Sequence, residues 1–284
     1  MEEILKRLTP DEIAQLNEEF DALTLKDDFI FGETMAAYPD LCRRLIEIIL
    51  DIKVKSIEYI DREKTLEERL DAKGVRLDVY VEEKGSGRSF DIEMQIVNHH
   101  DLEKRLRYYQ GMMDLDKLKR GNKYEKLGET YIIFICLFDY FNLGRRKYTF
   151  REVCLEEPTL KLNDGSTKVV LNAPGLKGDV SDELNGFLDY LMGRPVASNE
   201  FFNDLNRAVA KVKTGVERRM DFMKLSMLRH DWEKDAREEE RDRSNERFTL
   251  LTQKLIADGK TNEFEEIAKD KRRIETLCAL YGIT

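Results

Sequence analysis

The chain has 284 residues, of which 41% are hydrophobic and 37% charged, and its formal net charge is -9. This size allows a substantial buried core, no apolar run is long enough to span a membrane, and the start Met1–Lys6 lacks the apolar centre of a secretory signal, so we expect a cytoplasmic protein without a membrane segment. The four cysteines are scattered without CxxC spacing, which argues against a zinc site or a disulfide framework.

The amino-terminal part of the chain predicts helices separated by irregular segments. Residues 1–22 contain Thr9, an N-cap residue followed by proline, which predicts a short leading helix. Residues 23–38 show no clear period and predict a mixed, turn-containing segment. Apolar residues at helical spacing predict an amphipathic helix over 39–52, followed by an extended or irregular link over 57–70.

The clearest local pattern is a pair of alternating segments. Val75–Val81 and Ser89–Val97 alternate apolar with polar residues and are separated by a polar segment with two glycines, which predicts an antiparallel hairpin. The alternation places Asp78 of the first run and Glu93 of the second on polar faces of their strands, so the two carboxylates can share one face of a sheet.

The middle of the chain predicts further elements of an α/β fold. A helix is expected over residues 99–118, a strongly apolar central strand over 131–140, short strands over 148–153 and 168–172, and a helix over 182–192. This order predicts a mixed central sheet flanked by helices.

The last part of the chain differs in composition. Interspersed acidic and basic residues between 229 and 247 predict a long solvated helix, and residues 248–281 predict a terminal helical hairpin. We therefore predict three regions: an N-terminal helix over 1–22, a core over 23–193 and a charged helical region over 194–284.

The two hairpin carboxylates suggest chemistry. Neighbouring carboxylates repel each other unless a cation or a proton lies between them. Hard oxygen ligands of this kind suit Mg²⁺ or Mn²⁺, so Asp78 and Glu93, followed by Gln95, predict a site for phosphodiester hydrolysis. The alternative is an edge hairpin that only shows its polar face to water.

Asp78 followed by Glu93-Met94-Gln95 resembles the core of the PD-(D/E)XK nuclease fold, in the version with Gln in place of the usual Lys. More narrowly, the chain resembles the recombination-promoting nuclease and transposase family of bacteria, from about residue 23 to 190. The stretches that carry the resemblance are Leu25–Phe31, Leu77–Val79, Glu93–Gln95, Arg105–Tyr109 and Gly121–Tyr124.

This resemblance implies a restriction-endonuclease-like α/β core and a Mg²⁺-dependent DNA endonuclease, with Mn²⁺ as an alternative ion and no organic cofactor. It implies Asp78, Glu93 and Gln95 as catalytic residues. The metal ligands would be Asp78, Glu93 and the backbone carbonyl of Met94, with Glu47 as a further ligand. The alternative for Glu47 is an exposed helical glutamate.

DNA is the expected partner, although a net charge of -9 is unfavourable for binding a polyanion. Residues 98–127 nevertheless hold eight lysines or arginines against five acidic residues. The candidate nucleic-acid contacts are Arg105, Arg107, Tyr108, Tyr109, Lys73 and Arg76. The alternative is that the tyrosines belong to the core and the arginines to solvent. A homodimer is expected, because two symmetric sites suit the cutting of two strands.

A second function fits the same sequence. The chain would then be a DNA-binding or self-associating interaction protein with a weakly active or inactive nuclease core. RNA also stays open as a substrate, because no feature of the sequence reads a 2′-hydroxyl.

Overall fold

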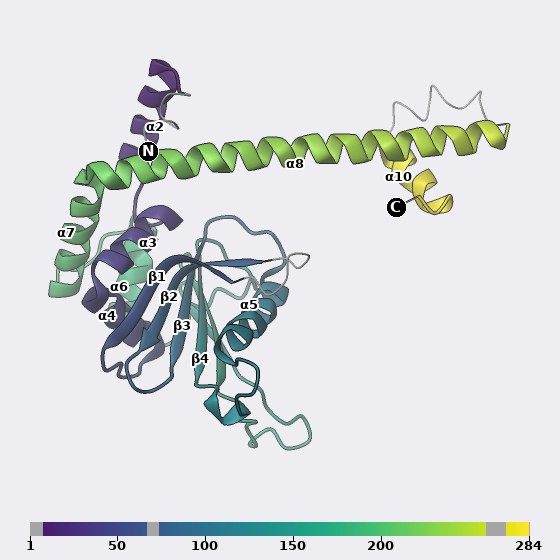
Figure 1. Cartoon of the computed structure of the whole chain (residues 1–284). Coiled ribbons are helices and arrows are strands. Elements are labelled where there is room, and N and C mark those ends of the chain that lie inside the picture. The colour runs from purple at the N-terminus through teal and green to yellow at the C-terminus, as the bar shows by residue number, and fades with distance from the viewer. Residues whose placement is uncertain (1–7, 67–73, 260–270, 284) are drawn as a thin grey trace. The chain divides into compact units, whose positions relative to one another are not determined.

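A computed structural model describes residues 8–66, 74–259 and 271–283. Its centre is a six-stranded sheet with the order β1-β2-β3-β4-β6-β5 (Figure 1). The strands are β1 Ile57–Leu66, β2 Val75–Glu83, β3 Ser89–Gln95, β4 Thr130–Cys136, β5 Lys147–Phe150 and β6 Ser166–Asn172. β3 pairs in parallel with β4, and β4 with β6, whereas the other pairs are antiparallel. The predicted mixed sheet is confirmed.

Two strands of this sheet form the predicted hairpin. β2 and β3 pair antiparallel, with Val79 opposite Ile92 and Tyr80 opposite Asp91. Every residue of β4 is buried, as expected for a strand with neighbours on both sides and helices on both faces.

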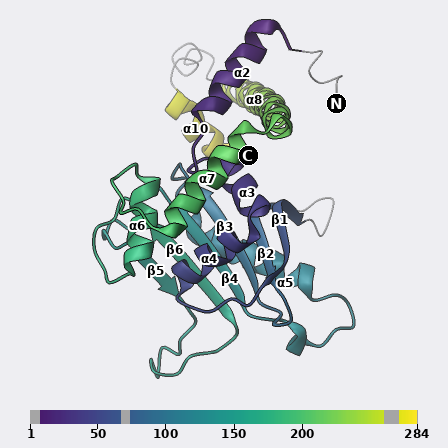
Figure 2. The ribbon, with the colours of Figure 1, turned by 90° about the vertical axis from the view of Figure 1, so that its left-hand side faces the viewer.

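Helices cover both faces of the sheet. One face packs against α3 Asp28–Ala37, α4 Pro39–Leu50, α6 Asp182–Leu191 and α7 Glu200–Thr214, which lie in front of the sheet in Figure 2. The opposite face packs against α5 Leu102–Lys117, whose Leu106 and Met113 contact the buried side chains of Ile132 and Phe134. The hairpin residues of β2 and β3 therefore lie between two helical layers.

Two elements differ from the sequence expectation. β1 is an edge strand, where an extended or irregular link was expected; its many charged residues are typical of exposed sheet edges. α3 is a helix, where a mixed segment was expected. Phe29 to Met35 are all buried, so this helix has no polar face and hence no amphipathic period.

Helix α3 lies unusually close to the sheet. A Cβ atom on Gly32 would lie 3.3 Å from Cγ of Arg62 in β1 and 3.5 Å from the carbonyl oxygen of Asp78 in β2. The distance to Asp78 is an ordinary contact and the distance to Arg62 is tighter, so a larger residue at position 32 would displace the Arg62 side chain by a few tenths of an ångström.

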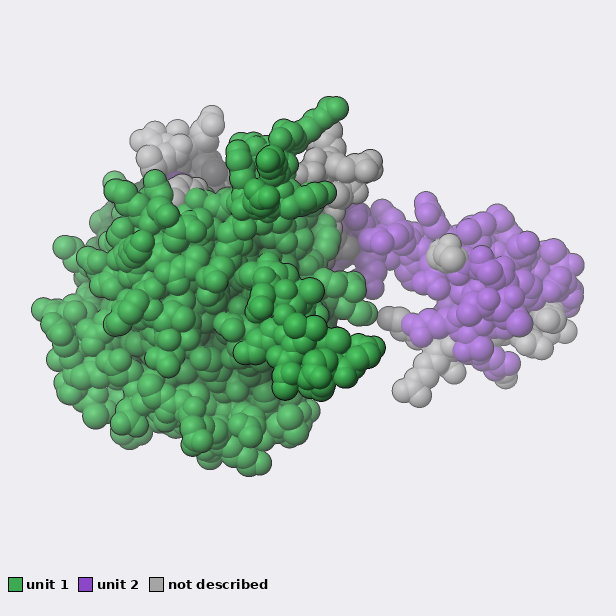
Figure 3. Space-filling view, turned by 90° about the horizontal axis from the view of Figure 1, so that it is seen from below, with its two compact units in different colours: residues 1–220 green, residues 221–284 purple. Residues whose placement is uncertain are grey.

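Clustering of contacts divides the chain into two compact units, Met1–Met220 and Asp221–Thr284 (Figure 3). The first includes α2 Pro10–Ala22, whose N-cap Thr9 and Glu12 form a capping box. It also includes α7, whose Phe201 and Leu205 are fully buried in the core of the sheet. Helix α7 thus extends this unit beyond residue 193, where we expected the core to end.

The second unit is helical. α8 Val216–Ala257 begins in the first unit and continues through the charged stretch, where residues 238–246 are exposed. Leu251 and Leu255 of α8 pack with Cys278 of α10 Lys271–Leu280 in a small core of their own. Within the described residues, no helix is both long and apolar enough to cross a membrane.

Candidate active site on the β2–β3 hairpin

The ladder between β2 and β3 stops where the predicted carboxylates lie. The last paired residues are Val79 and Ile92. Beyond them, the backbone N–H of Asp78 donates to Oε1 of Glu93 at 2.8 Å, and the N–H of Met94 donates to Oδ2 of Asp78 at 3.0 Å. Carboxylate oxygens thus replace carbonyl oxygens as acceptors, and each of the two acidic side chains contacts the backbone of the opposite strand.

A third carboxylate extends this group. Asp91 lies two residues before Glu93 and therefore on the same face of β3. Its side chain is fully buried, and no N–H or hydroxyl group of the described residues donates to its oxygens. Burial raises the pKa of Asp91, whereas the carboxyl group of Glu93, which is close enough to share a proton with it, lowers that pKa. A buried carboxylate is costly, so the pair favours a bound proton or a cation.

The electrostatics of the three groups agree with that reading. Burial raises the pKa of Asp78 to about 6, although the N–H of Met94 acts in the opposite direction. Burial and the charge of Asp78 raise the pKa values of Asp91 and Glu93 well above their ordinary values. Without a cation, the three groups therefore favour the protonated, uncharged form.

One basic side chain enters the group from α5. Nη1 of Arg105 donates to Oε1 of Gln95 at 2.5 Å, and Nη2 donates to the hydroxyl of Tyr109 at 2.9 Å. The same Nη2 lies 3.5 Å from Oε2 of Glu93. Arg105 thus offsets part of the charge of Glu93 but leaves the oxygens of Asp91 without a donor.

These oxygens suit a divalent cation. Mg²⁺ is usually held by one or two protein carboxylates together with water and phosphate oxygens, rather than by a complete protein cage. Among the described residues, no group of three acidic, histidine or cysteine side chains could hold a metal ion as they stand. Asp78 and Glu93 would therefore hold an ion as a pair, with the remaining ligands from solvent and substrate.

The comparison with protein families decides the identity of this core. Residues 28–180, more than half of the chain, match the family described as PD-(D/E)XK nuclease family transposase. The chain belongs to this family. The comparisons with curated proteins and with solved structures found no match. Membership in the PD-(D/E)XK nuclease family transposases indicates a nuclease or transposase role, and it agrees with the mixed sheet described above.

The structure places one further acidic residue near this group. Asp28 is the first residue of α3, and its negative charge contributes to the raised pKa of Asp78. Asp28 therefore lies near the acidic group of the PD-(D/E)XK core. Its only signal in the sequence is its place in the stretch Leu25–Phe31, which was noted for the family resemblance.

The other predicted site residues lie in different surroundings. Both oxygens of Glu47 accept hydrogen bonds at the end of α4, from the N–H of Val54 at 3.0 Å and from Nη1 of Arg43 at 3.2 Å. We therefore leave Glu47 out of the metal site proposed below. Lys73 lies outside the described residues. Arg76 is half-buried, and its charge lowers the pKa of Asp78.

The predicted nucleic-acid residues of α5 separate into two groups. Arg107 is exposed and Tyr108 is 40% exposed, so both face solvent. Tyr109 instead packs edge-on against Phe134 of β4, with ring centroids 5.6 Å apart, and accepts the hydrogen bond from Arg105. Arg105 and Tyr109 thus lie beside the acidic group, whereas Arg107 and Tyr108 lie on the exposed side of α5.

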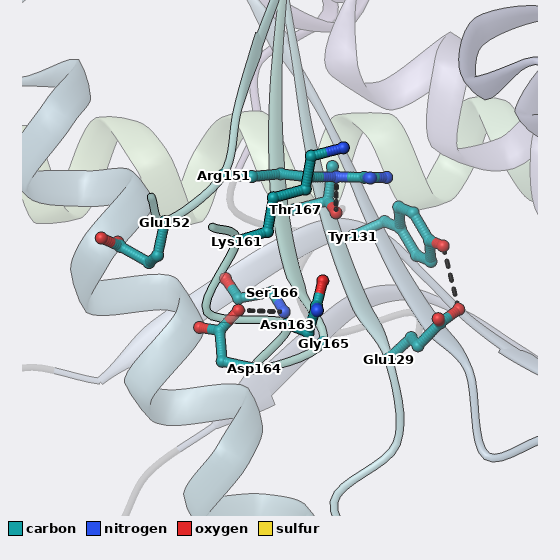
Figure 4. Close-up of a pocket in the computed structure, with 10 residues that line it drawn as sticks. All are labelled: Glu129, Tyr131, Arg151, Glu152, Lys161, Asn163, Asp164, Gly165, Ser166 and Thr167. Carbon is teal, nitrogen blue, oxygen red and sulfur yellow. Dashed lines mark hydrogen bonds between the residues drawn. The ribbon is translucent and has the colours of Figure 1, made fainter. Parts of the chain in front are cut away.

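A separate pocket lies at the N-terminal ends of β4 and β6 (Figure 4). Its side chains carry both signs of charge, and several are paired with each other: Nε of Arg151 donates to Oγ1 of Thr167 at 3.1 Å, and the hydroxyl of Tyr131 donates to Glu129. Ligands of α/β sheets usually bind outside the C-terminal ends of parallel strands. We therefore do not place the active site in this pocket.

Proposed function

We propose that the chain is a metal-dependent endonuclease that hydrolyses phosphodiester bonds of DNA. The observation that carries the proposal is the group of three carboxylates, with Asp91 and Glu93 buried and Asp78 half-buried, on the hairpin of a PD-(D/E)XK family core. In the reaction, water adds across one P–O bond and gives a phosphate monoester and a hydroxyl.

Each residue has a role that follows from its chemistry. Asp78 and Glu93 would hold Mg²⁺ or Mn²⁺, with the backbone carbonyl of Met94 as a further ligand and Asp91 beside them. The ion, when bound, supplies Lewis-acid polarisation of the scissile phosphate. Gln95 would orient the attacking water or a phosphate oxygen through its amide.

DNA would reach the site along the exposed side of α5. Arg107 and Tyr108 are accessible there, and Arg76 lies beside Asp78. Guanidinium groups contact phosphates, and an aromatic ring stacks on an unpaired base. Two copies of the chain would cut the two strands of a duplex symmetrically.

The test is nicking of a supercoiled plasmid by the full chain in the presence of Mg²⁺. A closed circle has no ends, so conversion to the open circle reports endonuclease activity alone. Asp78→Asn and Glu93→Gln should each lower the nicking rate by at least about 100-fold, the typical cost of removing one preorganised electrostatic group.

Glu152→Gln is the matched control, because it removes one exposed carboxylate in the pocket of Figure 4, away from the hairpin. It should nick like the unsubstituted chain. Absence of nicking by the unsubstituted chain with both Mg²⁺ and Mn²⁺, or equal rates in all four proteins, contradicts the proposal. A parallel reaction with single-stranded RNA tests whether the 2′-hydroxyl is tolerated.

One observation favours the alternative of an interaction protein with a weak or inactive core. The guanidinium of Arg105 already lies 3.5 Å from Glu93, so part of the negative charge is offset without an ion. In that case, the affinity of the chain for plasmid DNA would fall steeply with salt concentration, and the plasmid would remain a closed circle.

A further inference from the structure

We infer that Arg105 is a positioning residue that fixes the side-chain amide of Gln95, so that the NH₂ group of Gln95 faces the carboxylate site as a hydrogen-bond donor. This inference rests on the proposed nuclease function and specifies how its site is oriented. It differs from the sequence expectation, in which Arg105 contacts DNA phosphates.

The orientation of the amide follows from the chemistry of arginine. A guanidinium group has five N–H donors and no acceptor, so the Gln95 atom that faces it must be the carbonyl oxygen. The contact is 2.5 Å from Nη1 of Arg105 to Oε1 of Gln95. The NH₂ group of Gln95 is thereby directed to the other side, where Nε2 lies 3.5 Å from Oε2 of Glu93.

Arg105 is itself held in place. Its guanidinium lies over the rings of Phe134 and Tyr109, at 5.1 and 5.3 Å from their centroids, and donates to the Tyr109 hydroxyl. Its side chain is only 25% exposed. A guanidinium fixed by two rings, a hydroxyl and an amide is poorly placed to follow a DNA backbone, but it is well placed to hold a neighbour rigidly.

The consequence concerns what Gln95 can do in the reaction. Its carbonyl oxygen is held by Arg105 and keeps a second lone pair, but an amide oxygen is too weak a base to take a proton from water. Its amide protons face the carboxylate group, where negative charge develops on the phosphate oxygens. Gln95 therefore stabilises that charge as a donor, and the charge of Arg105 strengthens the donor by polarising the amide.

The decisive experiment separates the effects on kcat, on KM for DNA and on the salt dependence of KM. Arg105→Ala should lower kcat about 100-fold, as expected for the loss of an oriented donor, with KM and its salt dependence unchanged. Arg107→Ala serves as the reference for a phosphate contact. It should raise KM and reduce the slope of log KM against log salt by about 1.

The opposite pattern for Arg105→Ala, with a raised KM, a reduced salt slope and an unchanged kcat, overturns the inference and makes Arg105 a phosphate contact. Gln95→Glu adds a second criterion, because a carboxylate keeps the contact with Arg105 but donates no proton. It should lose about 100-fold in kcat, and retention of full kcat overturns the donor role.

Arg105→Lys guards against a variant that does not fold. Lysine keeps a positive charge near Glu93, so the unfolding midpoint that Arg105→Ala lowers should return to that of the unsubstituted chain. Lysine lacks the planar guanidinium, so kcat should recover only in part. Full recovery of kcat by lysine contradicts a positioning role through the guanidinium.

A readout without catalysis separates this inference from the proposed function. The side-chain NH₂ signals of Gln95, assigned in ¹⁵N spectra by their loss in Gln95→Glu, should be displaced from free-glutamine positions. In Arg105→Lys they should move toward those positions. Signals that keep their positions in Arg105→Lys overturn the inference, even if the chain never nicks DNA. Signals that are displaced in the unsubstituted chain and move in Arg105→Lys support it, whatever the plasmid assay shows.

Discussion

A buried carboxylate lies at each end of the hairpin of β2 and β3, and the pKa values of the two are shifted in opposite directions. At the turn, Glu83 is 2% exposed and accepts hydrogen bonds from Nε and Nη2 of Arg88 and from the N–H of Lys55. Burial alone would raise its pKa, but these donors, together with the hydroxyl of Ser86, lower it to about 2.

At the other end, Glu93 is equally buried at 2%, and its pKa is raised. Partners, and not burial, therefore decide the sign of the shift. The charge at the turn stabilises the fold, whereas the charge beside Asp91 costs stability in the protein alone. A carboxylate group that the fold itself leaves uncompensated is a common sign of a functional site.

The largest expected effect is at the turn. Arg88→Ala leaves Glu83 buried and without its main partner, and should lower the free energy of unfolding by about 3–5 kcal/mol. Urea unfolding at neutral pH measures the change. Lys84→Ala, on the exposed turn, is the control and should stay within about 0.5 kcal/mol. If Arg88→Ala lowers the free energy of unfolding by less than about 1 kcal/mol, the charge of Glu83 does not stabilise the fold as the comparison with Glu93 requires.

A smaller effect is expected from a cation at the site. Mg²⁺ or Mn²⁺ at 100 times its Kd should stabilise the fold by about 2.7 kcal/mol. The effect should be greater at pH 8 than at pH 5, because only the deprotonated carboxylates bind the ion. Thermal melts with the ion and with EDTA measure it. Asp78→Asn should abolish the stabilisation, and an equal ion effect in that variant would contradict the assignment.

The smallest expected effect concerns Asp91. Asp91→Asn removes a buried charge and allows the new amide to donate to Glu93, so it should stabilise the metal-free fold by about 1 kcal/mol at pH 8. At pH 4 the difference should vanish, because the raised pKa keeps Asp91 protonated there. Urea unfolding at the two pH values tests this, and destabilisation at pH 8 would contradict it.

The pH dependence of stability has opposite signs at the two ends. A carboxyl group with a raised pKa stabilises the fold below about pH 4, and that contribution is lost as the pH rises through its folded value, about 6 for Asp78. Glu83 contributes above its ordinary pKa instead, and its contribution is lost as the pH falls toward about 2.

The hairpin and the central strand could be predicted because their patterns are local. Alternation in β2 and β3 and the apolar run of β4 directly reflect burial on one or both faces. α3 could not be predicted in this way, since Phe29 to Met35 are buried on all sides. The core position of α7 depends on contacts of Phe201 and Leu205 that are distant in sequence.

The candidate site shows the same limit. The alternation of polar residues predicted that Asp78 and Glu93 share a site, and their backbone contacts agree with this. It did not predict that Asp91 lacks a donor, or that Arg105 reaches Gln95, because both depend on how α5 packs on the sheet. Side-chain chemistry can be read from sequence, whereas the partner of each group depends on tertiary packing.

The backbone hydrogen bonds between β2 and β3 end at Val79, and this links the pairing of the two strands to what binds at the carboxylates beyond them. The amides of Asp78 and Met94 are held by side-chain oxygens, so the cohesion of two strands depends on how those oxygens are occupied. A proton or a cation competes for the same lone pairs. Binding of either at these carboxylates would therefore alter the contacts between the two strands without an intervening loop.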